Sequence, residues 1–234
     1  MEMIDKALWN IVVEEPPNLV KKEDIVNGIE DEFGVVYSRD WRKILKCGNE
    51  EIITYTIKEG TNVICDRAFA NCISLQHITI PDSVTIIGDS SFMSCELLKQ
   101  VIIPNSITSI GYSTFSDCTS LKQIIIPNSI TKIDDQTFCR CKSLEKIIIP
   151  DSVTSIGKGA FSVCESLQQI IIPDSVTSIG DDALYCCNSL QQIIIPKGNM
   201  EKFKQLLPTE LWDKLYYLEK TDVNAEDMDN DLPF

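Results

Sequence analysis

The stretch "SVTSIGKGAFSVCESLQQIIIPD", residues 152–174, is followed at once by "SVTSIGDDALYCCNSLQQIIIPK", residues 175–197. Sixteen of the 23 positions are identical, and both copies place a cysteine and a proline at the same points. Such a fixed period indicates a structure built from stacked copies of one unit. Each unit is too short to bury its own apolar face, so neighbouring units must share one core.

The same period of 23 residues runs through the middle of the chain. Phenylalanine recurs at 69, 92, 115, 138 and 161, with Leu184 in the sixth place, and proline recurs at 81, 104, 127, 150, 173 and 196. The first cycle departs from the pattern, because Lys58 and Glu59 replace the proline and the Asp or Asn that follows it. Six cysteines keep the period too, and we call them the cysteine ladder: Cys72, Cys95, Cys118, Cys141, Cys164 and Cys187.

The apolar spacing inside one unit predicts two short extended segments. Leu98, Val101 and Ile103 have the spacing of a short strand whose alternate residues face inward. Proline then ends the strand, "PDS" or "PNS" turns the chain, and "VTSIG" forms a second extended piece. A period of 23 falls in the range of leucine-rich repeats. The predicted fold is therefore a right-handed leucine-rich repeat solenoid, poor in ordinary α/β structure, with short strands and capped ends.

The repeat resembles that of a known family. "SVTSIGKGAFSVCESLQQIIIP" resembles the BspA-like leucine-rich repeats of many bacteria and some protists, over about residues 24–218. "DEFGVVYSRDWRKILKC" resembles the amino-terminal capping unit of bacterial members, and "IIIPKGNMEKFKQLLPTELWDKLYYL" their closing strand and helix. The resemblance implies a surface or interaction protein.

The predicted organisation has five parts. They are an N-terminal helix and linker (1–22), a capping unit (23–58), six repeats (59–196), capping helices (197–218) and a disordered acidic tail (219–234). Terminal units must cover an otherwise open core. We expect Trp41, Ile44 and Leu45 to cap the front. For the back we expect residues at helical spacing: Phe203, Leu206, Leu207, Leu211, Trp212, Leu215 and Tyr216.

Charge is concentrated at the two ends of the chain. The formal net charge is −14, of which residues 1–34 carry −6 and residues 219–234 carry −5. Without a basic stripe, direct nucleic-acid binding is disfavoured. No run of 18 apolar residues suggests a membrane helix, and the N-terminus does not read as a signal peptide. We expect a cytoplasmic protein.

The ten cysteines raise the alternatives of a metal site or disulfides. The cysteine ladder has a simpler interpretation, in which a small buried thiol packs inside each unit and hydrogen-bonds weakly to the turning backbone. His77 is the only histidine and lies on a predicted strand, where no catalytic set can be assembled around it. We therefore expect no metal, no cofactor and no enzymatic activity.

The outward strand positions form the candidate protein-binding face. One row, the isoleucine ridge, contains Ile102, Ile125, Ile148, Ile171 and Ile194. Beside it, the polar row contains Gln100, Gln123, Lys146, Gln169 and Gln192. Isoleucine at these positions has two explanations, preference for strands or a contact surface for a partner or a second copy.

The last residues form a second candidate site for protein docking. Asp229, Asp231, Leu232, Pro233 and Phe234 resemble the acidic C-terminal peptide of bacterial single-stranded-DNA-binding proteins. That resemblance implies docking on DNA-maintenance enzymes through Phe234 and the carboxylates. The alternative is a solubilising acidic tail.

The function expected from these observations is that of a non-catalytic protein-binding scaffold in the cytoplasm, linked to DNA replication or repair proteins through the tail. One alternative is a cell-surface adhesin of the BspA-like type. The other is an inhibitor or immunity-type binding protein.

Overall fold

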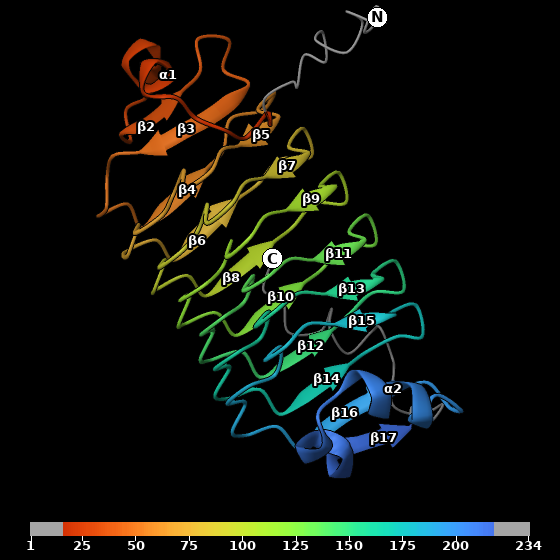
Figure 1. Ribbon diagram of the computed structural model, residues 1–234. Coiled ribbons are helices and arrows are strands. Elements are labelled where there is room, and N and C mark those ends of the chain that lie inside the picture. The colour runs from red at the N-terminus through yellow and green to blue at the C-terminus, as the bar shows by residue number, and fades with distance from the viewer. Residues whose placement is uncertain (1–15, 218–234) are drawn as a thin grey trace, which may run out of the picture.

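A computed structural model describes residues 16–217 of the chain. It shows an elongated solenoid whose coils are stacked in sequence order from the N-terminal end to the C-terminal end (Figure 1). Residues 1–15 of the N-terminal helix and linker expected at 1–22, and the whole of the tail expected at 219–234, lie outside the described residues.

The N-terminal end is closed by a small antiparallel unit. It comprises α1 (Lys22–Asn27) and three strands, β1 (Ile29–Glu30), β2 (Val35–Tyr37) and β3 (Lys43–Cys47). Ile44 of β3 is fully buried in the main core, whereas Leu45 faces the other side and packs in a smaller cluster. The ring of Trp41 lies 5.1 Å from that of the buried Tyr37. Aromatic and aliphatic side chains therefore cover the first coil.

Each coil then contributes two short strands, and each strand pairs in parallel with the equivalent strand of a neighbouring coil. The first row contains β4 (Thr54–Thr56), β6 (His77–Thr79), β8 (Gln100–Ile102), β10 (Gln123–Ile125), β12 (Lys146–Ile148), β14 (Gln169–Ile171) and β16 (Gln192–Ile195). The second row contains β5 (Val63–Ile64), β7 (Ile86–Ile87), β9 (Ser109–Ile110), β11 (Lys132–Ile133), β13 (Ser155–Ile156) and β15 (Ser178–Ile179). Paired residues are 23 apart, as in Gln100 opposite Gln123. The predicted leucine-rich repeat solenoid is confirmed.

The core of the solenoid is a set of parallel columns, one for each inward repeat position. The five repeat phenylalanines form one column, with successive ring centroids 5.4–5.7 Å apart and ring planes within 6° of parallel. Phe115, in the middle of the column, is fully buried. The repeat leucines form another buried column. Identical residues recur because each packs on its own copy in the next coil.

In four coils, the serine after the Pro-Asp or Pro-Asn pair also has a structural explanation. Its hydroxyl donates a hydrogen bond to a carbonyl oxygen of the preceding coil, 22 residues earlier, as from Ser152 Oγ to Ile130 O at 2.6 Å. Ser106, Ser129 and Ser175 repeat this bond at 2.5–2.7 Å. The "PDS" and "PNS" segments therefore connect adjacent coils as well as turning the chain.

The parallel sheets are interrupted in the middle of the solenoid. Strand β9 ends one sheet and β11 begins another, and the first row is likewise divided between β10 and β12. At the equivalent point of other coils a glycine lies against the previous coil: a Cβ on Gly111 would be 2.7 Å from the backbone nitrogen of Asp89. Asp134 occupies this position between β11 and the next turn. The break between β9 and β11 in the second row therefore coincides with an aspartate in place of this glycine.

The C-terminal end is closed by α2 (Met200–Leu206), a 3-10 helix (Thr209–Lys214) and strand β17 (Leu215–Tyr217). Phe203, Leu207 and Leu215 are buried against the last coil. Two residues expected in the cap are partly exposed, Trp212 at 39% and Tyr216 at 48%. For Tyr216 the helical spacing was misleading, because residues 215–217 pair with β16 as a strand and so turn its side chain outward. In the part of the chain described, no helix is long and apolar enough to span a membrane.

Candidate protein-binding face

The isoleucine ridge is built by the first row of strands. In β10, Ile124 points into the core while its neighbours Gln123 and Ile125 are exposed. Parallel pairing without a shift places Ile125 directly opposite Ile102. Ile148 lies opposite Ile171 in the same way. Side chains of one kind are therefore stacked along the solenoid on one face.

Exposure of the ridge falls from its N-terminal end, at Ile102, toward its C-terminal end, at Ile194. Ile102 is 64% exposed and Ile125 is 44% exposed, whereas Ile148 and Ile171 are half-buried. The expectation that all five isoleucines face solvent is wrong for Ile194, which is 5% exposed. Ile194 pairs in register with Tyr216 of β17, and the large tyrosine ring continues the row there. The accessible ridge is therefore Ile102, Ile125, Ile148 and Ile171.

The polar row runs beside the ridge on the same face. Gln123 and Lys146 are exposed, and Gln100, Gln169 and Gln192 are half-buried. The Gln169 amide donates to Gln192 Oε1 at 2.8 Å. Parallel register thus allows neighbouring amides of the row to hydrogen-bond along the stack, as this pair does.

Lysines add positive charge to this face. Lys99 and Lys122 directly precede β8 and β10, and Lys146 begins β12. Lys99 Nζ donates to Gln76 Oε1 at 3.0 Å. Among the residues of the polar row and the residues that directly precede them, the only carboxylate is that of Glu145. This stretch is therefore locally basic, although the net charge of the protein is −14. An apolar ridge flanked by amides and lysines suits a partner with apolar and acidic side chains.

The cysteine ladder is buried, and its thiols are free. From Cys95 to Cys187, each thiol donates to the carbonyl oxygen of the phenylalanine 26 residues earlier, at 3.1–3.2 Å. Burial raises the pKa of Cys95 and Cys187 to about 12 and that of Cys118 well above its ordinary value. Cys72 departs from the pattern, because its thiol interacts with that of Cys47 and lowers the pKa of Cys47. The geometry favours the packing interpretation of these cysteines.

Changing a ladder cysteine should affect stability. Cys118→Ser should lower the free energy of unfolding by about 1–3 kcal/mol, because a more polar group replaces the thiol in an apolar site. Cys118→Ala should cost a similar amount or less, through lost contacts. Urea unfolding measures both, with a substitution at the exposed Cys186 as the control. Equal stability of all variants would contradict the packing role.

Two surface grooves were not anticipated from the sequence. One, of about 520 Å³, lies along the loops between the two strand rows and is lined by residues that include Asp66, Asp89, Tyr112 and Arg140. Asp66 Oδ1 accepts from Asp89 N–H, and Asp89 Oδ1 accepts from Tyr112 N–H, each at 2.8 Å. Burial raises the pKa of Asp89. These carboxylates connect successive coils, so their recurrence has a structural cause.

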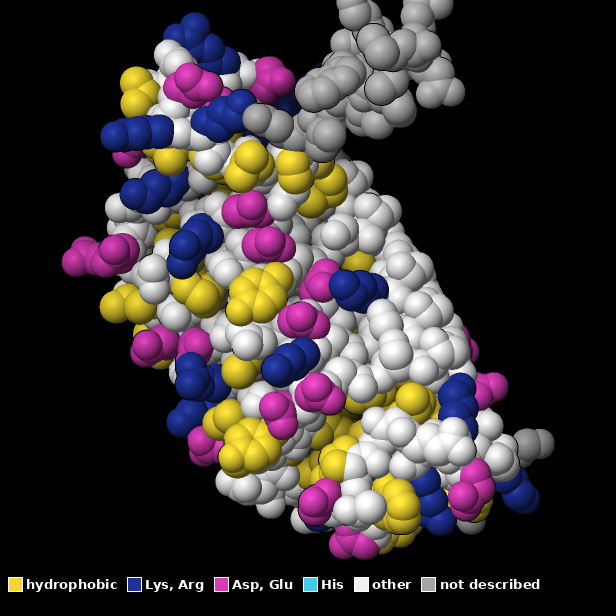
Figure 2. Space-filling view, viewed as in Figure 1, with side chains coloured by type: hydrophobic (Ala, Val, Ile, Leu, Met, Phe, Trp, Pro, Cys, Tyr) yellow, Lys and Arg dark blue, Asp and Glu magenta, His cyan; other side chains and the backbone are white. Residues whose placement is uncertain are grey.

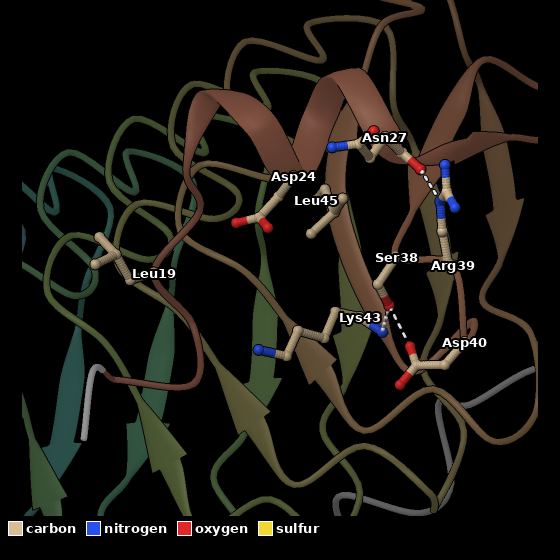
Figure 3. Close-up of a pocket in the computed structure, with 8 residues that line it drawn as sticks. All are labelled: Leu19, Asp24, Asn27, Ser38, Arg39, Asp40, Lys43 and Leu45. Atoms are coloured by element: carbon tan, nitrogen blue, oxygen red, sulfur yellow. Dashed lines mark hydrogen bonds between the residues drawn. The ribbon is translucent and has the colours of Figure 1, made fainter.

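The other groove, of about 430 Å³, lies between α1 and β3 at the N-terminal end (Figure 3). Arg39 Nε donates to Asn27 O at 3.1 Å, and Ser38 Oγ donates to Asp40 Oδ1 at 2.6 Å. The Ser38 hydroxyl is the main cause of a lowered pKa at Asp40. These contacts hold α1 and the β2–β3 turn together.

Other site expectations concern metal ions, nucleic acids and the tail. Across residues 16–217, no group of three or more His, Cys, Asp or Glu side chains is placed to hold a metal ion. On the face drawn in Figure 2, lysine and arginine side chains are interspersed with acidic ones. The candidate docking residues Asp229, Asp231, Leu232, Pro233 and Phe234 lie outside the described residues.

Solved structures of bacterial leucine-rich repeat proteins share this architecture. A T. pallidum leucine-rich repeat protein is 23% identical with a TM-score of 0.60, covering 77% of this chain and 97% of its own. One from Eubacterium ventriosum is 20% identical with a TM-score of 0.61, covering 68% and 50%. The pneumococcal vaccine antigen PcpA is 18% identical with a TM-score of 0.52, covering 83% and 43%. The chain thus spans about half the length of the last two, and these likenesses show a common fold.

A comparison by sequence identifies the family. None of the curated proteins compared with the chain matches it. The family model described as "BspA type Leucine rich repeat region (6 copies)" matches residues 46–149 and 131–207, the repeats and the start of the C-terminal cap. The chain belongs to the BspA-type leucine-rich repeat family.

Proposed function

We propose that the protein is a non-catalytic scaffold that binds a protein partner through the isoleucine ridge and the residues beside it. The observation that carries the proposal is the exposure of Ile102 and Ile125, at 64% and 44%, in a stacked row. Strand preference explains isoleucine in such a row, but it does not require an apolar side chain on the solvent face. A contiguous exposed apolar row flanked by polar groups is typical of an interaction surface.

Substitution of the ridge tests this function. Ile102, Ile125 and Ile148 are changed together to threonine, which keeps β-branching and removes apolar area. The fold should persist, because none of the three is fully buried, while association with a partner should weaken at least tenfold, about 1.4 kcal/mol. Quantitative affinity purification from cells measures partner capture, and light scattering measures self-association.

The matched control changes exposed apolar residues away from the ridge. Ile73 and Leu97 are 48% and 45% exposed and lie in the loops that precede the strands. Ile73→Thr with Leu97→Thr should leave association unchanged. Equal association by the ridge variant and the unaltered protein would favour strand preference as the explanation of the isoleucines.

Three finer expectations stay predictions. These are self-association through the ridge, a link to DNA-maintenance enzymes through the tail, and a cytoplasmic location. Cell fractionation checks the location, because a surface adhesin must be found in the envelope fraction.

A further inference from the structure

The isoleucine ridge leads directly to the point where the described chain ends. Ile148, Ile171, Ile194 and Tyr216 occupy successive places in one register across β12, β14, β16 and β17. Tyr216 is exposed, and the description of the chain ends one residue later, at Tyr217. Residues 218–234 therefore begin at the C-terminal end of the ridge.

These last residues are complementary in charge to the face beside the ridge. Residues 219–234 contain six acids and one lysine, a net charge of −5. Lys122 and Lys146 are exposed there, and within residues 16–217 neither has an acidic side chain at ion-pair distance. Apolar residues are interspersed with the acids: Leu218, Val223, Met228, Leu232 and Phe234. The segment thus offers both acidic and apolar side chains, which are the two kinds that suit the lysines and the isoleucine ridge of this face.

The segment is also long enough to reach the exposed part of the ridge. From β17 to β8 is five strand spacings of about 4.8 Å, or roughly 24 Å. The 14 residues from 218 to 231 span up to about 46 Å when extended, at about 3.3 Å each. Attachment to the same chain gives an effective concentration in the millimolar range, so even a weak contact is largely occupied.

We propose that residues 219–234 lie across the isoleucine ridge of their own chain, with carboxylates at Lys122 and Lys146 and apolar side chains on Ile102 and Ile125. The segment then competes with a protein partner for the ridge, and the partner must displace it. This regulatory role rests on the proposed function of the ridge, whereas the contact itself does not.

Zero-length cross-linking of the full-length protein tests the contact. A water-soluble carbodiimide activates a carboxyl group, an amine within contact displaces the activated oxygen to form an amide, and the reagent leaves as a urea. Mass spectrometry of the monomer fraction should find Lys122 and Lys146 joined to Glu226, Asp227, Asp229 or Asp231. Lys158, exposed beyond β13 in the second strand row, is the control and should not be joined to them. Equal yields at Lys158, or no product at Lys122 and Lys146, would overturn the proposal. Products found only in cross-linked dimers would assign the contact to a second copy and overturn it too.

Lysine acetylation rates give an independent measurement on full-length variants. With an effective concentration of about 1 mM, a contact with a dissociation constant of about 0.1 mM is occupied roughly nine-tenths of the time, which protects a covered amine about tenfold. A variant with Asp229→Asn, Asp231→Asn, Leu232→Ser and Phe234→Ser should acetylate faster at Lys122 and unchanged at Lys158. An unchanged rate at Lys122 would contradict the contact.

The outcomes separate this proposal from the function of the ridge. Loss of partner capture in the ridge variant without cross-links to Lys122 would leave the binding function and remove the tail contact. Cross-links without any effect of the ridge variant on partner capture would leave the contact and remove the binding function.

Discussion

Phe115→Ala should lower the free energy of unfolding by about 3–5 kcal/mol. The ring is fully buried in the middle of the phenylalanine column, with neighbours at 5.5 and 5.7 Å on either side. Alanine would leave a cavity between two coils that are held apart by the other columns, so the site cannot collapse. This loss is a large part of the 5–15 kcal/mol that stabilises a typical domain.

Urea unfolding followed by circular dichroism and by tryptophan fluorescence measures this loss. The two probes also test whether the coils on either side of residue 115 still unfold together, since contacts in a solenoid reach only neighbouring coils. Phe33→Ala is the matched control, because Phe33 is 48% exposed and should cost less than about 1 kcal/mol. A similar small loss for Phe115→Ala would show that the column does not stabilise the fold as argued.

Gly157→Ala should lower the free energy of unfolding by about 2–4 kcal/mol, although it adds only one methyl group. The new Cβ would lie 2.5 Å from the backbone nitrogen of Asp135 and 2.6 Å from the carbonyl carbon of Asp134. Overpacking costs about 1–3 kcal/mol. Separating the coils also weakens the bond from Gly157 N–H to Ile133 O, now 2.8 Å, by about 1 kcal/mol.

Thermal and urea unfolding of Gly157→Ala check this expectation. The control is Gly48→Ala, where the nearest atom to an added Cβ is 3.4 Å away. Without a clash, the alanine should be neutral or slightly stabilising, since it reduces the conformational freedom of the unfolded chain. If both alanine variants are equally stable, close approach of the coils is not the reason for glycine at this position.

Sequence periodicity was sufficient to predict the architecture. One leucine, one phenylalanine and one cysteine every 23 residues define columns, and a column can form only if successive units are stacked in register. The burial of Leu121, Phe115 and Cys118 follows from that stacking. The alternation of Gln123, Ile124 and Ile125 likewise predicted which side chains leave the core.

The accessible part of the candidate site was not predictable from the repeat. Ile125 and Ile194 occupy equivalent positions, yet one is 44% exposed and the other 5%. The difference arises from β17, whose residues show helical spacing in the sequence and pair with β16 in the structure. A repeat pattern contains no information about the unit that ends it.

By itself, the sequence determined the stacked units, their inward columns and the face on which the isoleucines lie, because these depend on local periodicity and on contacts between identical neighbours. Tertiary structure alone decided the rest: the interruption at Asp134, the hydrogen bonds of Ser152 and Cys118 to earlier coils, and the burial of Ile194. Each depends on how closely two coils approach, or on which terminal segment covers the last one. Such distances are set by the packing of whole coils, which no single repeat specifies.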